Sequence, residues 1–190
     1  MDNNAKQCVQ TCFFHMRKIR QLRQFPDDNT MHTLIRALVL SRLDYCNNLY
    51  AGCMISTLHR LQRVQDAAAR LLCGASPRAH ARPLLQQLHW LPAVTSRIQY
   101  KLCVLMFDIY HGTAPSYMLE LCKRCTDSRL RSAAHGDFTI PRTCLRFTDR
   151  SFALTGPKAC NALPSRLHTL TCKDTFRKNL KTHFFNHCFN

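Results

Sequence analysis

Two neighbouring carboxylates are the residues of this sequence that most invite a catalytic interpretation. Phe25-Pro26-Asp27-Asp28 imitates the aromatic-x-Asp-Asp turn of polymerases, in which two or three carboxylates converge on divalent metal ions. The pair follows a helical stretch rather than a strand, and Pro26 cannot donate to a hairpin ladder. The only earlier carboxylate is that of Asp2. We therefore expect Asp27 or Asp28 to cap a helix, and we predict no catalytic residue.

Cysteine and histidine provide two half-sites for zinc. Cys122 and Cys125 have zinc-knuckle spacing, and His183 and His187 lie one helical turn apart. A structural zinc site needs four ligands, and neither half-site has a compactly spaced second pair. We expect no metal and no other cofactor, although zinc at either half-site stays an open alternative. Most of the twelve cysteines would then serve as small apolar side chains.

The remaining motifs of enzymes are missing. The sequence contains no G-x-x-x-x-G-K, G-x-G-x-x-G or G-x-S-x-G, and Glu120 is its only glutamate. No nucleophile and base can be paired by their spacing. We therefore predict that the chain is not an enzyme and takes no small-molecule substrate.

The net charge points to a polyanionic partner. Lys and Arg number 27 against 11 Asp and Glu, which leaves +16, and arginine is the residue that pairs bidentately with phosphate. The positive charges are spread along the chain, which favours nucleic acid over a membrane. A basic surface that only keeps the chain soluble is the alternative. The expected contacts lie on helix faces opposite the apolar stripes: Arg17, Arg20, Arg60, Arg63, Arg177, Lys178 and Lys181.

Helical periodicity dominates the first part of the chain and predicts the elements that position these cations. We predict a helical domain over residues 1–124, with one helix ending at Phe25-Pro26, a second, apolar nearly all round, at the centre of the bundle, and a third from Ser56 to Gly74. A short helix is expected from Pro83. The next is expected from Pro92 to Tyr110.

Two arginines of this domain have expected partners. Arg42 projects from an apolar stripe between Leu38 and Tyr45, and a buried arginine must be paired. An internal ion pair is therefore the favoured interpretation of Arg42, with a ligand contact as the alternative. Asp66 precedes Arg70 by four residues, a spacing that suits a surface ion pair on a helix.

The rest of the chain, residues 125–190, is predicted to be a basic extension of mixed structure. Short alternating stretches at 138–140 and 145–147 suggest a β-hairpin or a few short strands. A final helix, capped by Asp174, would carry Phe176, Leu180 and Phe184 on its apolar side. The fold class is thus mainly α: a helical bundle followed by a small mixed segment with a short β-hairpin and a C-terminal helix.

The sequence shows no recognisable secretory signal or membrane-spanning segment. No apolar region follows the polar segment 1–6 as a secretory signal would require, and no apolar run reaches the roughly 20 residues that span a bilayer. These observations predict an intracellular protein, nuclear or cytoplasmic, without a membrane partner.

Several of these segments also occur together, in order, in a known family. SRLDYCN (41–47), LQRVQDAAARLL (61–72) and LHWLP (88–92) resemble the region after the polymerase domain in the reverse transcriptases of jockey-like non-LTR retrotransposons (LINEs). The similarity continues in RIQYKLCVLMFDIYHGTAPSYMLEL (97–121), PRT (141–143), SFALTGPKACNALP (151–164) and TFRKNLKTHFF (175–185). The chain departs from the family at Cys160, where an aromatic Trp is usual.

The resemblance implies a function for the basic surface. It implies a helical thumb that grips the template-primer duplex and a downstream segment that helps to hold RNA. The polymerase palm and its catalytic carboxylates would lie upstream and are not expected in this chain. The expected partners are therefore RNA or an RNA–DNA duplex. A non-functional relic of such an element and a protein-interaction bundle recruited by a host are the alternatives.

Overall fold

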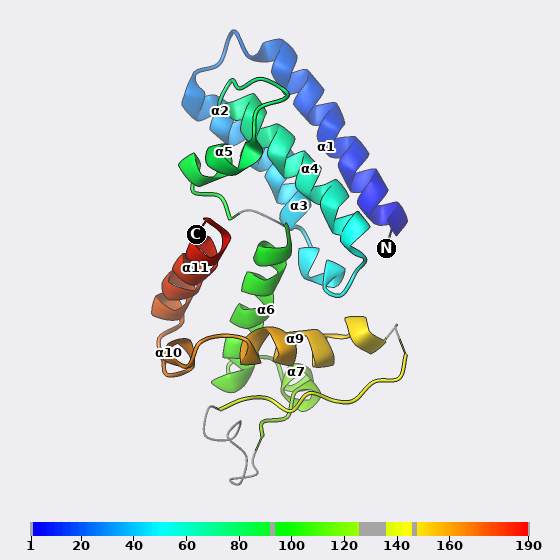
Figure 1. Cartoon of the computed structure of the whole chain (residues 1–190), viewed down its shortest axis with the longest axis vertical. Coiled ribbons are helices and arrows are strands. Elements are labelled where there is room, and N and C mark those ends of the chain that lie inside the picture. Colours follow the sequence, from blue (N-terminus) through cyan, green and yellow to red (C-terminus); the bar gives the residue numbers. More distant parts are fainter. Residues whose placement is uncertain (1, 92–93, 126–135, 146–147, 190) are drawn as a thin grey trace. The chain divides into compact units, whose positions relative to one another are not determined.

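Helices dominate the structure (Figure 1), which confirms the mainly α fold class. The computed structural model describes residues 2–91, 94–125, 136–145 and 148–189. It consists of two compact units, residues 1–97 with 188–190 and residues 98–187. The domain boundary predicted at residue 124 falls inside the second unit and stays a prediction. In the described ranges, no helix is both long and apolar enough to cross a membrane.

The first unit is built on two long helices and a central helical run. The long helices are α1 (Asp2–Leu22) and α4 (Ile55–Leu72), and the run comprises α2 (Asp28–Ile35), the π-helical η1 (Arg36–Leu40) and α3 (Ser41–Asp44). A 3-10 turn, η2 (Asn47–Tyr50), and the short α5 (Ala81–Gln87) complete the unit. The central run packs against both α1 and α4, as its nearly continuous apolar sequence predicted. Its buried side chains are Met31, Ile35, Val39, Leu40 and Leu43.

Helices α1 and α4 run parallel: the beginning of α1 lies beside the beginning of α4, and the end of α1 lies beside the end of α4. At their beginnings, the Thr57 hydroxyl donates to the Asp2 carboxylate at 2.9 Å. At their ends, the Arg23 guanidinium lies so close to Gly74 that an added Cβ would stand 2.3 Å from it. Gly74 has φ +66°, a left-handed conformation that ends α4 as predicted. The parallel arrangement, visible in Figure 1, gives the two helices one long shared edge.

The π-helical turn overturns the prediction for Arg42. A π turn inserts one residue into the helical repeat, so the side chains that follow it rotate relative to an uninterrupted α-helix. Val39, Leu40 and Leu43 are consequently buried, whereas Arg42 is exposed. Among the described residues, no ion pair joins Arg42 to a carboxylate. The internal ion pair expected from the apolar stripe is therefore wrong.

The second unit contains most of α6 (Val94–Tyr110) and of α11 (Lys173–Phe189), together with α7 (Ser116–Leu121), α9 (Phe152–Asn161) and α10 (Ser165–His168). A 3-10 turn, η3 (Thr148–Arg150), precedes α9. Gly156 lets α9 approach α6 closely, since an added Cβ would stand 2.7 Å from the Met106 sulfur. The rings of Phe107 and Phe176 stack with centroids 4.4 Å apart. A buried cluster completes the core: Met106, Ile109, Cys122, Phe138 and Cys160.

The predicted β-hairpin is not seen in the described residues, which contain no strand. Phe138 forms an isolated antiparallel bridge with Arg124. The Asn161 side chain donates to the Phe138 carbonyl at 2.8 Å and accepts from its amide at 3.0 Å. Because this side chain satisfies the backbone of Phe138, the segment needs no second strand there. Of the predicted second strand, residues 146–147 lie outside the described residues.

Candidate nucleic-acid interface

The seven predicted contact residues fall into two sets. Arg17 and Arg20 on α1 and Arg60 and Arg63 on α4 belong to the first unit, whereas Arg177, Lys178 and Lys181 on α11 belong to the second. Arg60 is partly exposed and the other six are exposed, so all seven are accessible to a ligand.

In the first unit, helical spacing brings the α1 arginines to the edge shared with α4. Asp2, Lys6, Arg17 and Arg20 share one face of α1, because their separations approximate whole numbers of 3.6-residue turns. Asp2 marks where this face meets α4, since its carboxylate contacts Arg60. Arg63 follows Arg60 by one helical turn and is exposed. Arg17, Arg20 and Arg63 therefore belong to one basic edge of the α1–α4 pair, called the α1–α4 edge below.

One arginine of this edge is already paired. The Nη1 atom of Arg60 lies 3.2 Å from both Asp2 carboxylate oxygens, and Lys6 is 3.9 Å from the same group. The Thr57 hydrogen bond lowers the pKa of Asp2, and the charges of Arg60 and Lys6 add to this effect. The carboxylate is thus ionised and offsets part of the positive charge of Arg60. Arg60 is the weakest of the four predicted contacts in this unit.

Two aromatic side chains on α1 that were not singled out from the sequence are exposed. Phe13 is 38% exposed and Phe14 is 56% exposed, and the Lys18 ammonium lies 5.9 Å from the centre of the Phe14 ring. Their positions off the buried stripe of Ala5, Cys12, Met16 and Ile19 were the available signal. Exposed rings beside cations are suited to stacking against unpaired bases.

In the second unit, α11 separates its apolar and basic sides as predicted. Phe176, Leu180 and Phe184 are buried. A hydrogen bond with Tyr100 raises the pKa of Arg177, so this guanidinium already has a protein partner. Among the described residues, no ion pair engages Lys178 or Lys181. These two lysines are the better candidates for phosphate contacts on α11.

The carboxylate pair and the cysteine half-site considered in the sequence lie in surroundings that suit a structural role. Asp27 is the N-cap residue of α2, as expected, and the Thr30 side chain lowers its pKa. Cys122 is buried, and burial raises its pKa to about 11, which disfavours the thiolate that binds zinc. Within the described ranges, no three His, Cys, Asp or Glu side chains are grouped closely enough to hold a metal ion.

The predicted ion pair of α4 is wrong. Asp66 accepts a hydrogen bond of 2.6 Å from Gln62, and Arg70 donates through Nε to the Ala79 carbonyl at 2.8 Å. The side chain of Arg70 therefore holds the loop after α4 instead of pairing along the helix. The spacing of four residues permits an ion pair but does not outweigh a carbonyl within reach of the guanidinium.

Comparison with known proteins returned no relative. The chain matches no family model, no curated protein and no solved structure.

Proposed function

We propose that the chain is the non-catalytic C-terminal region, thumb and post-polymerase, of a jockey-like non-LTR retrotransposon reverse transcriptase. It binds RNA or a template-primer duplex through phosphate contacts, with little sequence preference. The order and spacing of its motifs support the family, and the charge of +16 supports the polyanionic ligand. The catalytic carboxylates of such an enzyme belong to its palm.

The α1–α4 edge is the observation that carries this proposal. Arg17, Arg20 and Arg63 are exposed on it, and each of the two helices contains a single carboxylate, Asp2 in α1 and Asp66 in α4. Parallel helices set their side chains along one line, which suits successive phosphates of a backbone. Phosphate contacts of this kind fix position without reading sequence.

Salt dependence of binding tests the proposal. The full chain is titrated with an RNA–DNA duplex and with single-stranded RNA at several salt concentrations. If about five side chains touch phosphates, the logarithm of the association constant should fall with log salt at a slope of roughly −3.5 to −4.5. No binding at about 50 mM salt, or a slope near zero, contradicts the proposal.

Three variants of one cluster sharpen this test. Arg63→Ala should flatten the slope by about one. Arg60→Ala should flatten it less, because Asp2 already offsets the charge of Arg60. Asp2→Asn should steepen the slope, because it releases both Arg60 and Lys6. Equal effects of Arg60→Ala and Arg63→Ala would contradict the inference that Asp2 weakens the Arg60 contact, and an unchanged slope in Arg63→Ala would contradict the assignment of the α1–α4 edge.

A second candidate function is protein interaction, favoured by one segment. The connection from α3 to α4 exposes large apolar side chains, with Tyr45 78%, Ile55 70% and Met54 63% exposed. Such a group is typical of interaction surfaces. Under this alternative, Arg63→Ala leaves the partner bound and Ile55→Asp releases it.

A further inference from the structure

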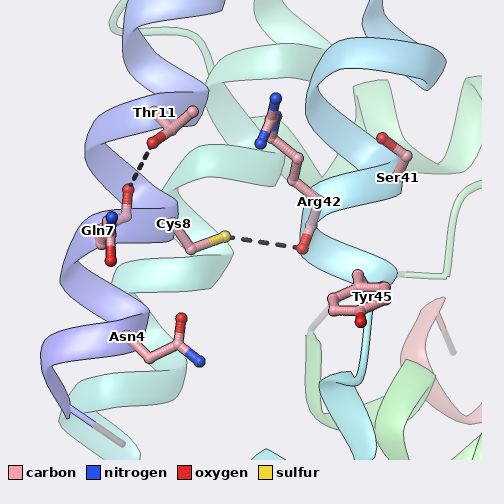
Figure 2. A pocket seen from close by; sticks show the side chains of 7 residues that line it. All are labelled: Asn4, Gln7, Cys8, Thr11, Ser41, Arg42 and Tyr45. Carbon is pink, nitrogen blue, oxygen red and sulfur yellow. Dashed lines mark hydrogen bonds between the residues drawn. The ribbon is translucent and has the colours of Figure 1, made fainter.

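A polar hollow of about 440 Å³ lies between α1 and α3. Asn4, Gln7, Cys8 and Thr11 line it from α1, and Ser41, Arg42 and Tyr45 line it from the other side (Figure 2). No carboxylate is among these lining residues, and Arg42 is the one basic side chain among them. The hollow therefore has a positive side and favours an anionic occupant.

Cys8 provides the nucleophile of this hollow. Its thiol points from α1 toward the helix of Arg42 (Figure 2) and donates to the Arg42 carbonyl at 3.7 Å. One helical turn further on, the sulfur of the fully buried Cys12 lies 3.8 Å from the Val39 carbonyl oxygen, which competes with Cys8 for the single hydrogen of this thiol. Cys8 is only partly buried, so a reagent in the hollow can reach its sulfur.

The surroundings of Cys8 favour its thiolate. A hydrogen bond from Cys12 and the charge of Arg42 lower the pKa of Cys8 to about 7, although partial burial opposes them. The same hydrogen bond, together with burial, raises the pKa of Cys12, so Cys12 stays a thiol and a donor. Thiolate is the reactive form of cysteine, and a pKa of about 7 gives Cys8 a larger thiolate fraction at neutral pH than an ordinary cysteine has.

We propose that this hollow is a thiol modification site at which Cys8 exchanges with small disulfides that carry a carboxylate, and Arg42 binds the carboxylate. The inference stands apart from nucleic-acid binding, because none of the lining residues belongs to the proposed contacts on the α1–α4 edge. It rests on the cavity, the placement of the two cysteines and the charge of Arg42, which pairs with no carboxylate among the described residues.

The exchange is balanced without a further reactant. The Cys8 thiolate attacks one sulfur of the small disulfide, a new S–S bond forms to that sulfur, and the original S–S bond breaks. The departing sulfur takes the electron pair and leaves as a thiolate, so Cys8 is oxidised and the departing half is reduced. Cys12 remains a thiol, so the mixed disulfide at Cys8 is the product.

Two disulfide reagents of opposite character test the proposal on the intact chain. One is 5,5′-dithiobis(2-nitrobenzoate), which carries two carboxylates, and the other is the uncharged 4,4′-dithiodipyridine. Rates at individual cysteines are read by peptide mass spectrometry after brief exposure at pH 7. Arg42→Gln should slow the anionic reagent at Cys8 by roughly five- to tenfold, the size of a charge–charge attraction at close range in water. The same substitution should slow the uncharged reagent by less than about twofold, because only the pKa effect of Arg42 remains.

Matched controls are available in the same chain. Arg42→Lys should restore most of the preference for the anionic reagent, because it keeps the charge. Cys172 is an exposed reference, since hydrogen bonds from the backbone of Thr175 lower its pKa, and its preference should not respond to Arg42→Gln. Helical content by circular dichroism verifies that each variant is folded. The proposal is overturned if Cys8 forms no adduct, or if Arg42→Gln slows both reagents equally.

Discussion

Each of the two units contains a pair of cysteines, and the pKa of an accessible thiol is lowered in one unit while the pKa values of both buried thiols are raised in the other. In the first unit, Cys8 borders a polar hollow and receives a hydrogen bond from Cys12, which lowers its pKa to about 7. In the second unit, Cys103 and Cys160 are buried. Burial raises the pKa of both thiols, to about 12 for Cys160. The Cys103 thiol donates to the Ala159 carbonyl at 3.5 Å.

The comparison separates two causes that act on a thiol. Cys8 and Cys103 each lie on a long helix, Cys8 partly buried on α1 and Cys103 buried on α6. Burial disfavours the charged form in both places, and the hydrogen bond from Cys12 and the charge of Arg42 reverse the balance only at Cys8. The reactivity of a cysteine here follows from the donors beside it and not from its place on a long helix.

The largest expected effect is the contrast in labelling itself. In the folded chain at pH 7, an uncharged disulfide reagent should modify Cys8 at least about a thousandfold faster than Cys160, because both the thiolate fraction and access to the sulfur differ. Mass spectrometry of peptides after timed quenching measures both rates. In denaturant the two rates should converge. Labelling of Cys160 within tenfold of Cys8 in the folded chain would break the comparison.

A smaller effect is expected from loosening the packing around the buried Cys160 in the second unit. Asn161→Ala removes both partners of the buried Phe138 backbone. An unsatisfied buried polar group costs about 1–3 kcal/mol, so the unfolding free energy should fall by about that amount. Urea unfolding of the variant measures the change, and Cys160 should label faster in proportion.

Asn161→Asp is the matched control. The aspartate keeps the oxygen that accepts from the Phe138 amide but has no donor for the Phe138 carbonyl. The unfolding free energy of Asn161→Asp should therefore lie between those of the parent chain and of Asn161→Ala. A urea midpoint for Asn161→Ala equal to that of the parent would show that this side chain does not hold the segment.

The helices could be predicted because their signals are local. The buried sides of α4 and α11, the end of α4 at Gly74 and the cap at Asp27 all follow from residues within a few positions of one another.

The π turn of η1 has no such signal, and it removed Arg42 from the core. Cys46 is exposed with φ +49° because the helix ends beside it, so it is not one of the cysteines that serve as small apolar side chains. Helix α9 was missed because Gly156 and Pro157 disfavour a helix, and packing on Met106 outweighs their propensities.

The candidate sites were predictable in part. Amphipathic spacing predicted that the seven candidate cations lie on accessible helix faces, because exposure of a helix face is a periodic property; their contacts with a ligand stay a prediction. The pairing of Arg60 with Asp2 joins residues 58 positions apart in sequence, and the hollow at Cys8 needs α1 and α3 to meet. Such contacts depend on how the elements pack, and spacing within one helix does not encode them.

The smallest expected effect concerns the hydrogen bond that distinguishes Cys8. Cys12→Ala removes the donor, so the pKa of Cys8 should rise toward its ordinary value. At pH 7 the thiolate fraction falls, while the intrinsic nucleophilicity of the remaining thiolate rises, and the net rate should drop by roughly three- to fivefold. Cys12→Ser keeps a donor and should retain most of the rate.

The pH profile isolates this cause from a simple change in packing. The rate at Cys8 should rise with pH through about 7 in the parent chain and level off above it, because deprotonation is then complete. In Cys12→Ala the rate should continue to rise to higher pH. Other ionisable side chains near Cys8 include Arg42 and Tyr45, which line the hollow, and Tyr50. Burial raises the pKa of the Tyr50 hydroxyl, so this group does not titrate near pH 7. Identical profiles for the parent and Cys12→Ala would mean that Cys12 only fills space, and the difference between the two units would then rest on Arg42 and solvent access.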